Sequence, residues 1–124
     1  MPAAEPKIPG PDHPITISPA LKRVRVRFGD DVIADASDAL DLKESTYPVA
    51  RYVPRSAVQM DRLVKTDHTT HCPYKGDASY FSIVAKDGTR LENAVWSYET
   101  PFPAMAEIAG YLAFYPNKVE INVG

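Results

Sequence analysis

The stretch from His68 to Val84, HTTHCPYKGDASYFSIV, carries many of the residue types in this chain that can do chemistry. It holds the only cysteine, Cys72, together with two of the three histidines and the Lys75-Gly76 pair. The thiolate is the nucleophilic form of cysteine, and a nearby cation such as Lys75 or Arg51 favours that form. An unpaired cysteine is otherwise a small buried hydrophobic residue, and no histidine shares its strand face. The stretch therefore indicates either a reactive site or a tight hairpin.

Motifs for metal and phosphate binding are incomplete in this sequence. His71 and Cys72 are neighbours on an extended strand and point to opposite faces, so they form neither a metal-ligand pair nor a catalytic dyad. Structural zinc sites pair Cys-x-x-Cys ligands, and one cysteine predicts no metal site. The chain also lacks an Asp-x-Asp pair, a Gly-Ser dipeptide and a glycine-rich phosphate loop. We expect neither a metal nor a cofactor.

A second set of residues suits a small ligand better than the cysteine does. The segments ARYVPR and AVWSYET supply aromatic rings, guanidinium groups and a carboxylate, which bind planar or anionic molecules by stacking and hydrogen bonding. We expect a pocket between the Cys72–Gly76 turn and the Trp96–Glu99 strand. The predicted ligand-binding residues are Arg51, Tyr52, Cys72, Lys75, Gly76, Trp96, Tyr98 and Glu99. The same aromatic side chains would equally fill a hydrophobic core.

Short alternating segments dominate the rest of the chain and predict an all-β fold. The expected strands cover residues 24–28, 32–36, 69–74 and 78–85, with others near 40–42, between Pro48 and Pro54, along 89–99, and on both sides of a turn at 116–117. Pro54 is expected to open one helical turn, and PFPAMAEIAG predicts a short helix near residues 103–109. We expect about eight short strands with this helix, in a small barrel-like or tent-like meander.

Composition and charge limit the classes of function. The 124 residues suit one domain, with residues 1–14 a flexible proline-rich arm and residues 15–124 a single β-rich domain. A net charge of −2 argues against nucleic acid as a partner, and the basic face of residues 23–27 is expected to be solvated. No apolar run approaches the roughly 20 residues that span a bilayer, and no secretory signal is visible. We therefore expect a soluble, cytoplasmic protein that binds no membrane.

Three segments, HCPYKGDASYFSI, AVWSYETPFP and AGYLAFYPNKVEI, occur in an order and spacing that resemble the family called domain of unknown function 427. The resemblance covers about residues 24–121. It implies a small, mostly β, barrel-like or tent-like domain and carries a provisional nucleotidyltransferase label. The carboxylates do not support that label, because they are expected at turns or on solvent faces, namely at Asp30, Asp31, Asp35, Asp38 and Asp41.

Three functions remain open from the sequence. The preferred one is an uncharacterised domain that binds a small anionic or planar ligand in the pocket described above. An alternative is an enzyme, a transferase or hydrolase acting on a phosphorylated or nucleotide-like substrate, with Lys75 and Arg51 as anion anchors and Glu99 as general base. The other alternative is an interaction module without a pocket, which forms a homodimer through exposed Tyr111, Phe114 and Tyr115.

Overall fold

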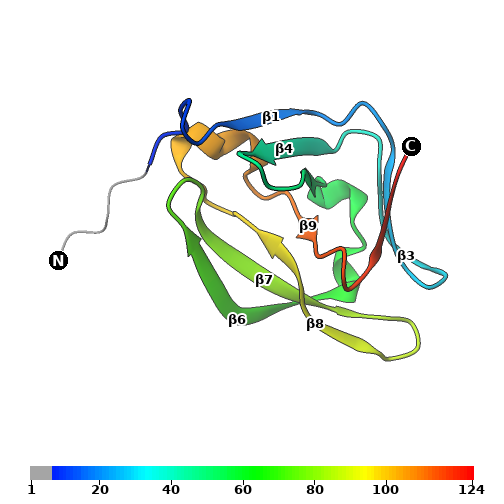
Figure 1. Ribbon diagram of the computed structural model, residues 1–124. Helices are drawn as coiled ribbons and strands as arrows, with labels where there is room; N and C mark the ends of the chain where they lie inside the picture. The colour runs from blue at the N-terminus through cyan, green and yellow to red at the C-terminus, as the bar shows by residue number, and fades with distance from the viewer. Residues whose placement is uncertain (1–6) are drawn as a thin grey trace.

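The computed structural model describes residues 7–124 and consists mainly of short antiparallel strands (Figure 1). The strands are β1 (Ile15–Pro19), β2 (Val24–Phe28), β3 (Asp31–Ala36), β4 (Leu40–Glu44), β5 (Ala50–Tyr52), β6 (Leu63–Cys72), β7 (Gly76–Val84), β8 (Arg90–Ser97), β9 (Ala113–Phe114) and β10 (Glu120–Val123). Three short 3-10 helices are present: η1 (Arg55–Ala57), η2 (Met60–Arg62) and η3 (Pro103–Ile108). The all-β prediction is confirmed, with ten strands instead of about eight.

The ten strands form three antiparallel sheets in the orders β1-β4-β5, β10-β2-β3 and β6-β7-β8-β9. In Figure 1 the sheets enclose a common interior, with β1 and β4 on one side and β6, β7 and β8 on the other. An isolated bridge between Val53 and Leu112 connects the segments that follow β5 and precede β9. No helix within residues 7–124 has the length and apolar character needed to cross a membrane.

Strand β2 shows how the alternating sequence produces the sheet. Val24 and Val26 are almost fully buried, because alternate side chains of a strand point to the same face. The arginines on either side of these valines pair with acidic residues of the neighbouring strands: Arg23 lies 2.5 Å from Asp35, and Arg27 lies 3.0 Å from Glu120. The basic face is thus a row of exposed ion pairs.

The amino-terminal segment, residues 7–14, lies against the hairpin turn between β6 and β7. The amide of Lys7 donates a hydrogen bond of 2.9 Å to the carbonyl of Pro73. The ring of His13 stacks on Tyr74 with 4.2 Å between ring centroids. The flexible arm predicted for residues 1–14 falls partly outside the described residues, at 1–6, and residues 7–14 lie against the domain.

The β6–β7 hairpin turns two residues earlier than the sequence suggested. Cys72 pairs with Gly76 in the ladder, so the turn consists of residues 73–75, whereas the strands expected at 69–74 and 78–85 left residues 75–77 for the turn. Gly76 has φ +111°, a conformation that L side chains rarely adopt, and it lies close to the backbone of Phe102. This register holds Lys75 at the tip of the hairpin and turns its side chain inward.

Two hydrophobic clusters fill the interior. The larger is built by β2, β3, β7 and β8 around Ile33 and Ile83. The smaller contains most of the buried tyrosines and is closed by η3 through Met105 and Ile108. Pro103 lies in the first turn of η3, as its sequence predicted. The smaller cluster borders the candidate site.

Candidate functional site

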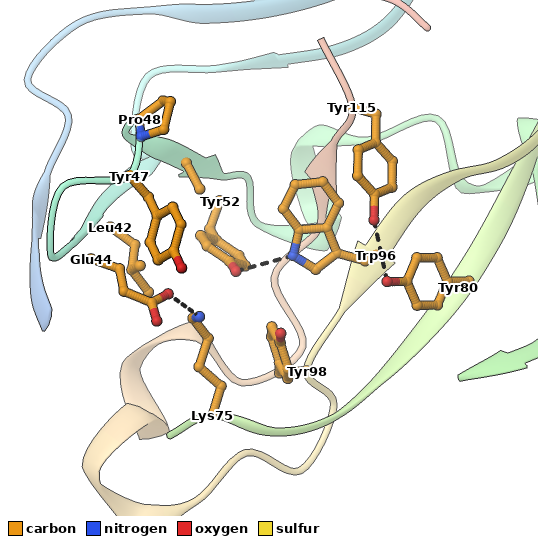
Figure 2. A pocket seen from close by; sticks show the side chains of 11 residues that line it. Leu42, Glu44, Tyr47, Pro48, Tyr52, Lys75, Tyr80, Trp96, Tyr98 and Tyr115 are labelled. Atoms are coloured by element: carbon orange, nitrogen blue, oxygen red, sulfur yellow. Dashed lines mark hydrogen bonds and ion pairs between the residues drawn. The ribbon is translucent and has the colours of Figure 1, made fainter. Parts of the chain in front are cut away.

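A cavity of about 230 Å³ opens beside the smaller cluster, between the β1-β4-β5 sheet and the β6-β7-β8-β9 sheet. Figure 2 shows its side chains, which come from strands far apart in the sequence. The lining residues are Leu42, Glu44, Tyr47, Pro48, Ala50, Tyr52, Lys75, Tyr80, Trp96, Tyr98 and Tyr115. Six of these eleven are aromatic, so flat hydrophobic faces dominate the walls.

Lys75 provides the positive charge of the cavity. Its residue is only 8% exposed, and its ammonium group forms an ion pair with the carboxylate of Glu44. The same nitrogen lies 3.6 Å from the sulfur of Cys72 and 5.8 Å from the ring centroid of Tyr98. A buried ammonium group requires a counter-ion, and Glu44 supplies it across 31 residues of sequence.

Glu44 divides its two carboxylate oxygens between two partners. Oε1 accepts from Lys75, while Oε2 lies 2.8 Å from Nε2 of His13 in the amino-terminal segment. Burial raises the pKa of the Glu44 carboxyl, but the hydrogen bonds from Lys75 and His13 outweigh burial and hold it below the ordinary value of 4.5. Glu44 therefore stays ionised at neutral pH and fixes Lys75 in place.

The aromatic wall is held together by hydrogen bonds between its polar edges. Nε1 of Trp96 donates to the hydroxyl of Tyr52 at 3.1 Å, and these two rings meet edge to face. The rings of Trp96 and Tyr115 lie 4.6 Å apart, and the hydroxyls of Tyr115 and Tyr80 are 3.2 Å apart. Burial raises the pKa of Tyr115 to about 12, so its hydroxyl stays protonated. The polar edges of these four rings are thus linked in two hydrogen-bonded pairs.

A family model described as domain of unknown function 427 matches residues 16–124. The chain belongs to this family. No curated protein matches it. The match covers every strand except the first residue of β1, and it includes all lining residues of the cavity.

Four of the eight predicted site residues line the cavity of this DUF427 domain. They are Tyr52, Lys75, Trp96 and Tyr98. Cys72 and Gly76 flank the hairpin turn that carries Lys75, and Cys72 is half-buried. The remaining two predicted residues, Arg51 and Glu99, do not line it. Arg51 pairs with Asp41 on the adjacent strand, with 3.4 Å between Nε and Oδ1.

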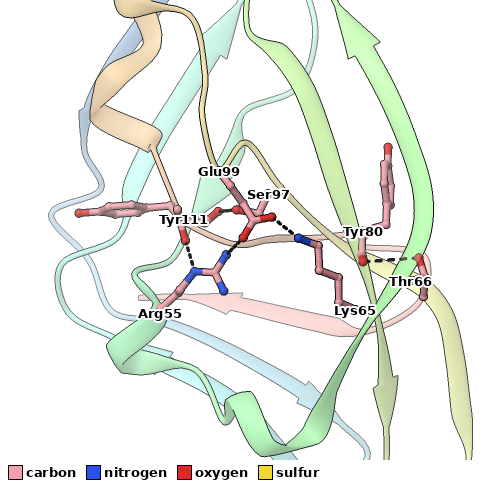
Figure 3. Close-up of polar contacts among 8 residues, drawn as sticks. Arg55, Lys65, Thr66, Tyr80, Ser97, Glu99 and Tyr111 are labelled. Carbon is pink, nitrogen blue, oxygen red and sulfur yellow. Dashed lines mark hydrogen bonds and ion pairs between the residues drawn. The ribbon is translucent and has the colours of Figure 1, made fainter.

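Glu99 belongs to a separate polar cluster, shown in Figure 3. Its carboxylate accepts from Arg55 at 2.9 Å and from Lys65 at 2.7 Å, while Nε of Arg55 donates to the carbonyl of Gly110. The hydrogen bond from Lys65 is the main cause that lowers the pKa of the Glu99 carboxyl below 4.5. A carboxylate with a lowered pKa is a poor proton acceptor, so this geometry does not favour Glu99 as a general base.

Two expectations about side-chain exposure were wrong. Phe114 is only 4% exposed, because β9 pairs with β8 and turns this ring into the larger cluster; Tyr111 and Tyr115 are half-buried. These three residues therefore do not form an exposed patch. Asp31 is also buried, because its carboxylate is paired with Arg62 of η2, so it is not a solvent-facing turn residue.

The sequence reasoning missed seven lining residues: Leu42, Glu44, Tyr47, Pro48, Ala50, Tyr80 and Tyr115. Tyr47 and Pro48 lie in the turn between β4 and β5, and Tyr47 is 60% exposed at the edge of the cavity. The only local sequence signal for a site in this segment is Tyr47 itself, a large aromatic residue in a turn. Within residues 7–124 no group of three or more His, Cys, Asp or Glu side chains is arranged to hold a metal ion.

Proposed function

We propose that this DUF427 domain binds a small planar or anionic ligand in the cavity at Lys75 and Trp96. One observation carries the proposal: a buried ammonium group faces a cavity whose walls are mostly aromatic rings. Concave, largely apolar sites with a few convergent polar groups are typical of small-molecule binding. The rings provide stacking surfaces, and Lys75 provides a fixed donor that orients the ligand.

The hydrogen bonds that hold the side chains around the cavity also support the binding of a ligand there. Glu44 and His13 hold Lys75 from one side, and the Trp96–Tyr52 hydrogen bond holds the opposite wall. A ligand therefore meets side chains that are already in position, which reduces the entropy lost on binding. Glu99 lies outside this cavity, and both of its carboxylate oxygens already accept hydrogen bonds, from Arg55 and Lys65. We therefore place the ligand in the cavity and not at Glu99.

The first test is a thermal-shift screen of the purified protein against nucleotides, phosphorylated metabolites, aromatic acids and common cofactors. A ligand that binds only the folded state stabilises it by about 2.7 kcal/mol at a concentration 100 times its Kd. We expect at least one compound to raise the Tm of the wild type. The shift should vanish in Lys75→Ala and Trp96→Ala.

Lys22→Ala is the matched control, because Lys22 is exposed and makes no ion pair or hydrogen bond among the described residues. It should keep the full shift. A shift that survives in both cavity variants would place the ligand elsewhere on the domain. If no compound changes the Tm of the folded wild-type protein, the result counts against ligand binding and favours an interaction module.

A further inference from the structure

Several hydrogen-bond donors of the cavity around Lys75 have no partner among the described residues. Each oxygen of the Glu44 carboxylate already has a partner, Lys75 for Oε1 and His13 for Oε2. Lys75 carries three protons, of which one points to Glu44 and one to the sulfur of Cys72. One ammonium proton therefore remains for a ligand.

Two tyrosine hydroxyls add further donors to the same space (Figure 2). Tyr98 lines the cavity, and its hydroxyl makes no hydrogen bond to any described residue. The Tyr52 hydroxyl accepts from Trp96, which leaves its own proton free. Burial raises the pKa of both hydroxyls, so they remain protonated at neutral pH. The complementary group on a ligand is a hydrogen-bond acceptor.

Size limits the rest of the ligand. The cavity of about 230 Å³ is smaller than the ~300–1,000 Å³ of sites for drug-sized ligands. Its walls are flat rings, with Trp96 and Tyr115 only 4.6 Å apart at the side away from Lys75. This volume suits one aromatic ring or two fused rings and is too small to enclose a nucleoside triphosphate.

Charge selects among the acceptor groups. A protonated amine is itself only a hydrogen-bond donor, so it cannot accept from Lys75, Tyr98 or Tyr52. Glu44 already balances the Lys75 ammonium, so its carboxylate repels each negative charge that a ligand brings, and a phosphate dianion brings two where a carboxylate brings one. A carboxylate carries one delocalised charge and accepts several hydrogen bonds at once. It matches three donors better than a phosphate or an amine does.

We propose that the ligand is a small aromatic carboxylate, with its carboxylate on Lys75, Tyr98 and Tyr52 and its ring against Trp96. This inference rests on the proposed function and specifies the ligand class of that same cavity. The ring replaces water on the aromatic wall, and the carboxylate supplies the acceptor that Tyr98 lacks.

Isothermal titration calorimetry with five probes tests the proposal: benzoate, indole-3-carboxylate, phenyl phosphate, benzylamine and benzyl alcohol. We expect one or both carboxylates to bind at least tenfold more tightly than the other three. Tyr98→Phe keeps the ring and removes one donor to a charged group, so it should weaken carboxylate binding about tenfold. Tyr111→Phe is the control, because Tyr111 is half-buried but outside the cavity, and its affinity should match the wild type.

The outcomes separate this inference from the proposed function. Phenyl phosphate, benzylamine or benzyl alcohol could bind as tightly as the carboxylates or more tightly, with binding lost in Trp96→Ala. That result would overturn the preference for a carboxylate, while the cavity would still be a site for aromatic rings. Unchanged carboxylate affinity in Tyr98→Phe would overturn the assigned donors. Failure of all five probes would overturn the ligand class, and the thermal-shift screen would then decide whether the cavity binds anything.

Discussion

Two buried ion pairs in this domain differ in how fully their hydrogen-bonding groups are used. In the first, Arg62 donates to both oxygens of Asp31, and its Nε donates to the carbonyl of Val84 at 3.0 Å. The amide of Lys86 adds a further bond of 3.1 Å to Asp31. This pair ties η2 to the start of β3 and to the turn after β7, and its carboxylate has a partner on each oxygen.

The second pair, Glu44 and Lys75, is buried to a similar degree but faces the cavity. Each oxygen of its carboxylate also has a partner, Lys75 or His13, whereas the ammonium retains a donor. The neighbouring hydroxyl of Tyr98 has no partner among the described residues. A satisfied pair away from a cavity stabilises the fold, while a pair with spare donors beside a cavity is suited to recognition. Burial of charge alone therefore does not identify a site.

The largest expected effect comes from breaking each pair in turn. Asp31→Asn removes the charge that Arg62 needs and should lower the free energy of unfolding by about 2 kcal/mol. Lys75→Met should cost less, about 1 kcal/mol, because Glu44 keeps His13 and gains access to water in the cavity. Urea unfolding of both variants measures the difference.

Asp67→Asn is the control for the first variant, since Asp67 is exposed and makes no ion pair among residues 7–124; its midpoint should stay at the wild-type value. A larger loss in Lys75→Met than in Asp31→Asn would reverse the comparison. Lys75 would then be chiefly a structural residue.

Lowering the pH should also weaken the Asp31–Arg62 pair, with a smaller effect on the free energy of unfolding than the substitutions have. Hydrogen bonds from Arg62 hold the pKa of Asp31 below its ordinary 3.8. A carboxyl with a lower pKa in the folded than in the unfolded protein contributes stability that is complete above the unfolded pKa and is lost as the pH falls through the folded pKa. Unfolding free energies measured between roughly pH 5 and pH 2 should therefore fall more steeply for the wild type than for Asp31→Asn. Parallel curves would contradict the role given to Asp31, and Asp67→Asn should follow the wild type.

Local pattern predicted most of the fold. The alternation through Val24 and Val26 indicated β2, and the proline and glycine around residues 103–110 indicated η3. Strand β1 was missed: the predicted arm ended at residue 14, and no strand was assigned to the residues directly after it, although Ile15 and Ile17 alternate with polar residues. The turn at residues 73–75 was displaced because Gly76 was assigned to the turn itself. Local signals identify elements but do not fix the pairing register.

The site was harder to predict because its polar contacts join distant segments. Lys75, Trp96 and Tyr98 are predictable because an ammonium group and aromatic rings in these short segments indicate ligand binding by residue type alone. Glu44 resembled any surface carboxylate, and only the β1–β4 pairing places it beside the hairpin tip, 31 residues from Lys75. Arg51 and Glu99 are adjacent in sequence to aromatic residues of the cavity. On β5 adjacent side chains point to opposite faces, so Arg51 points away from the face of Tyr52, whereas Glu99 lies beyond the end of β8 and contacts Arg55 and Lys65.

The smallest expected effect separates two tyrosines of the cavity. Tyr52→Phe removes the acceptor of the Trp96 indole and should lower the free energy of unfolding by about 1 kcal/mol. Tyr98→Phe removes a hydroxyl that has no partner among the described residues, so the change should stay within about 0.5 kcal/mol. Paired urea unfolding curves decide between them. If Tyr98→Phe destabilises the protein as much as Tyr52→Phe does, the Tyr98 hydroxyl has a partner within the folded protein. It is then not a free donor for a ligand.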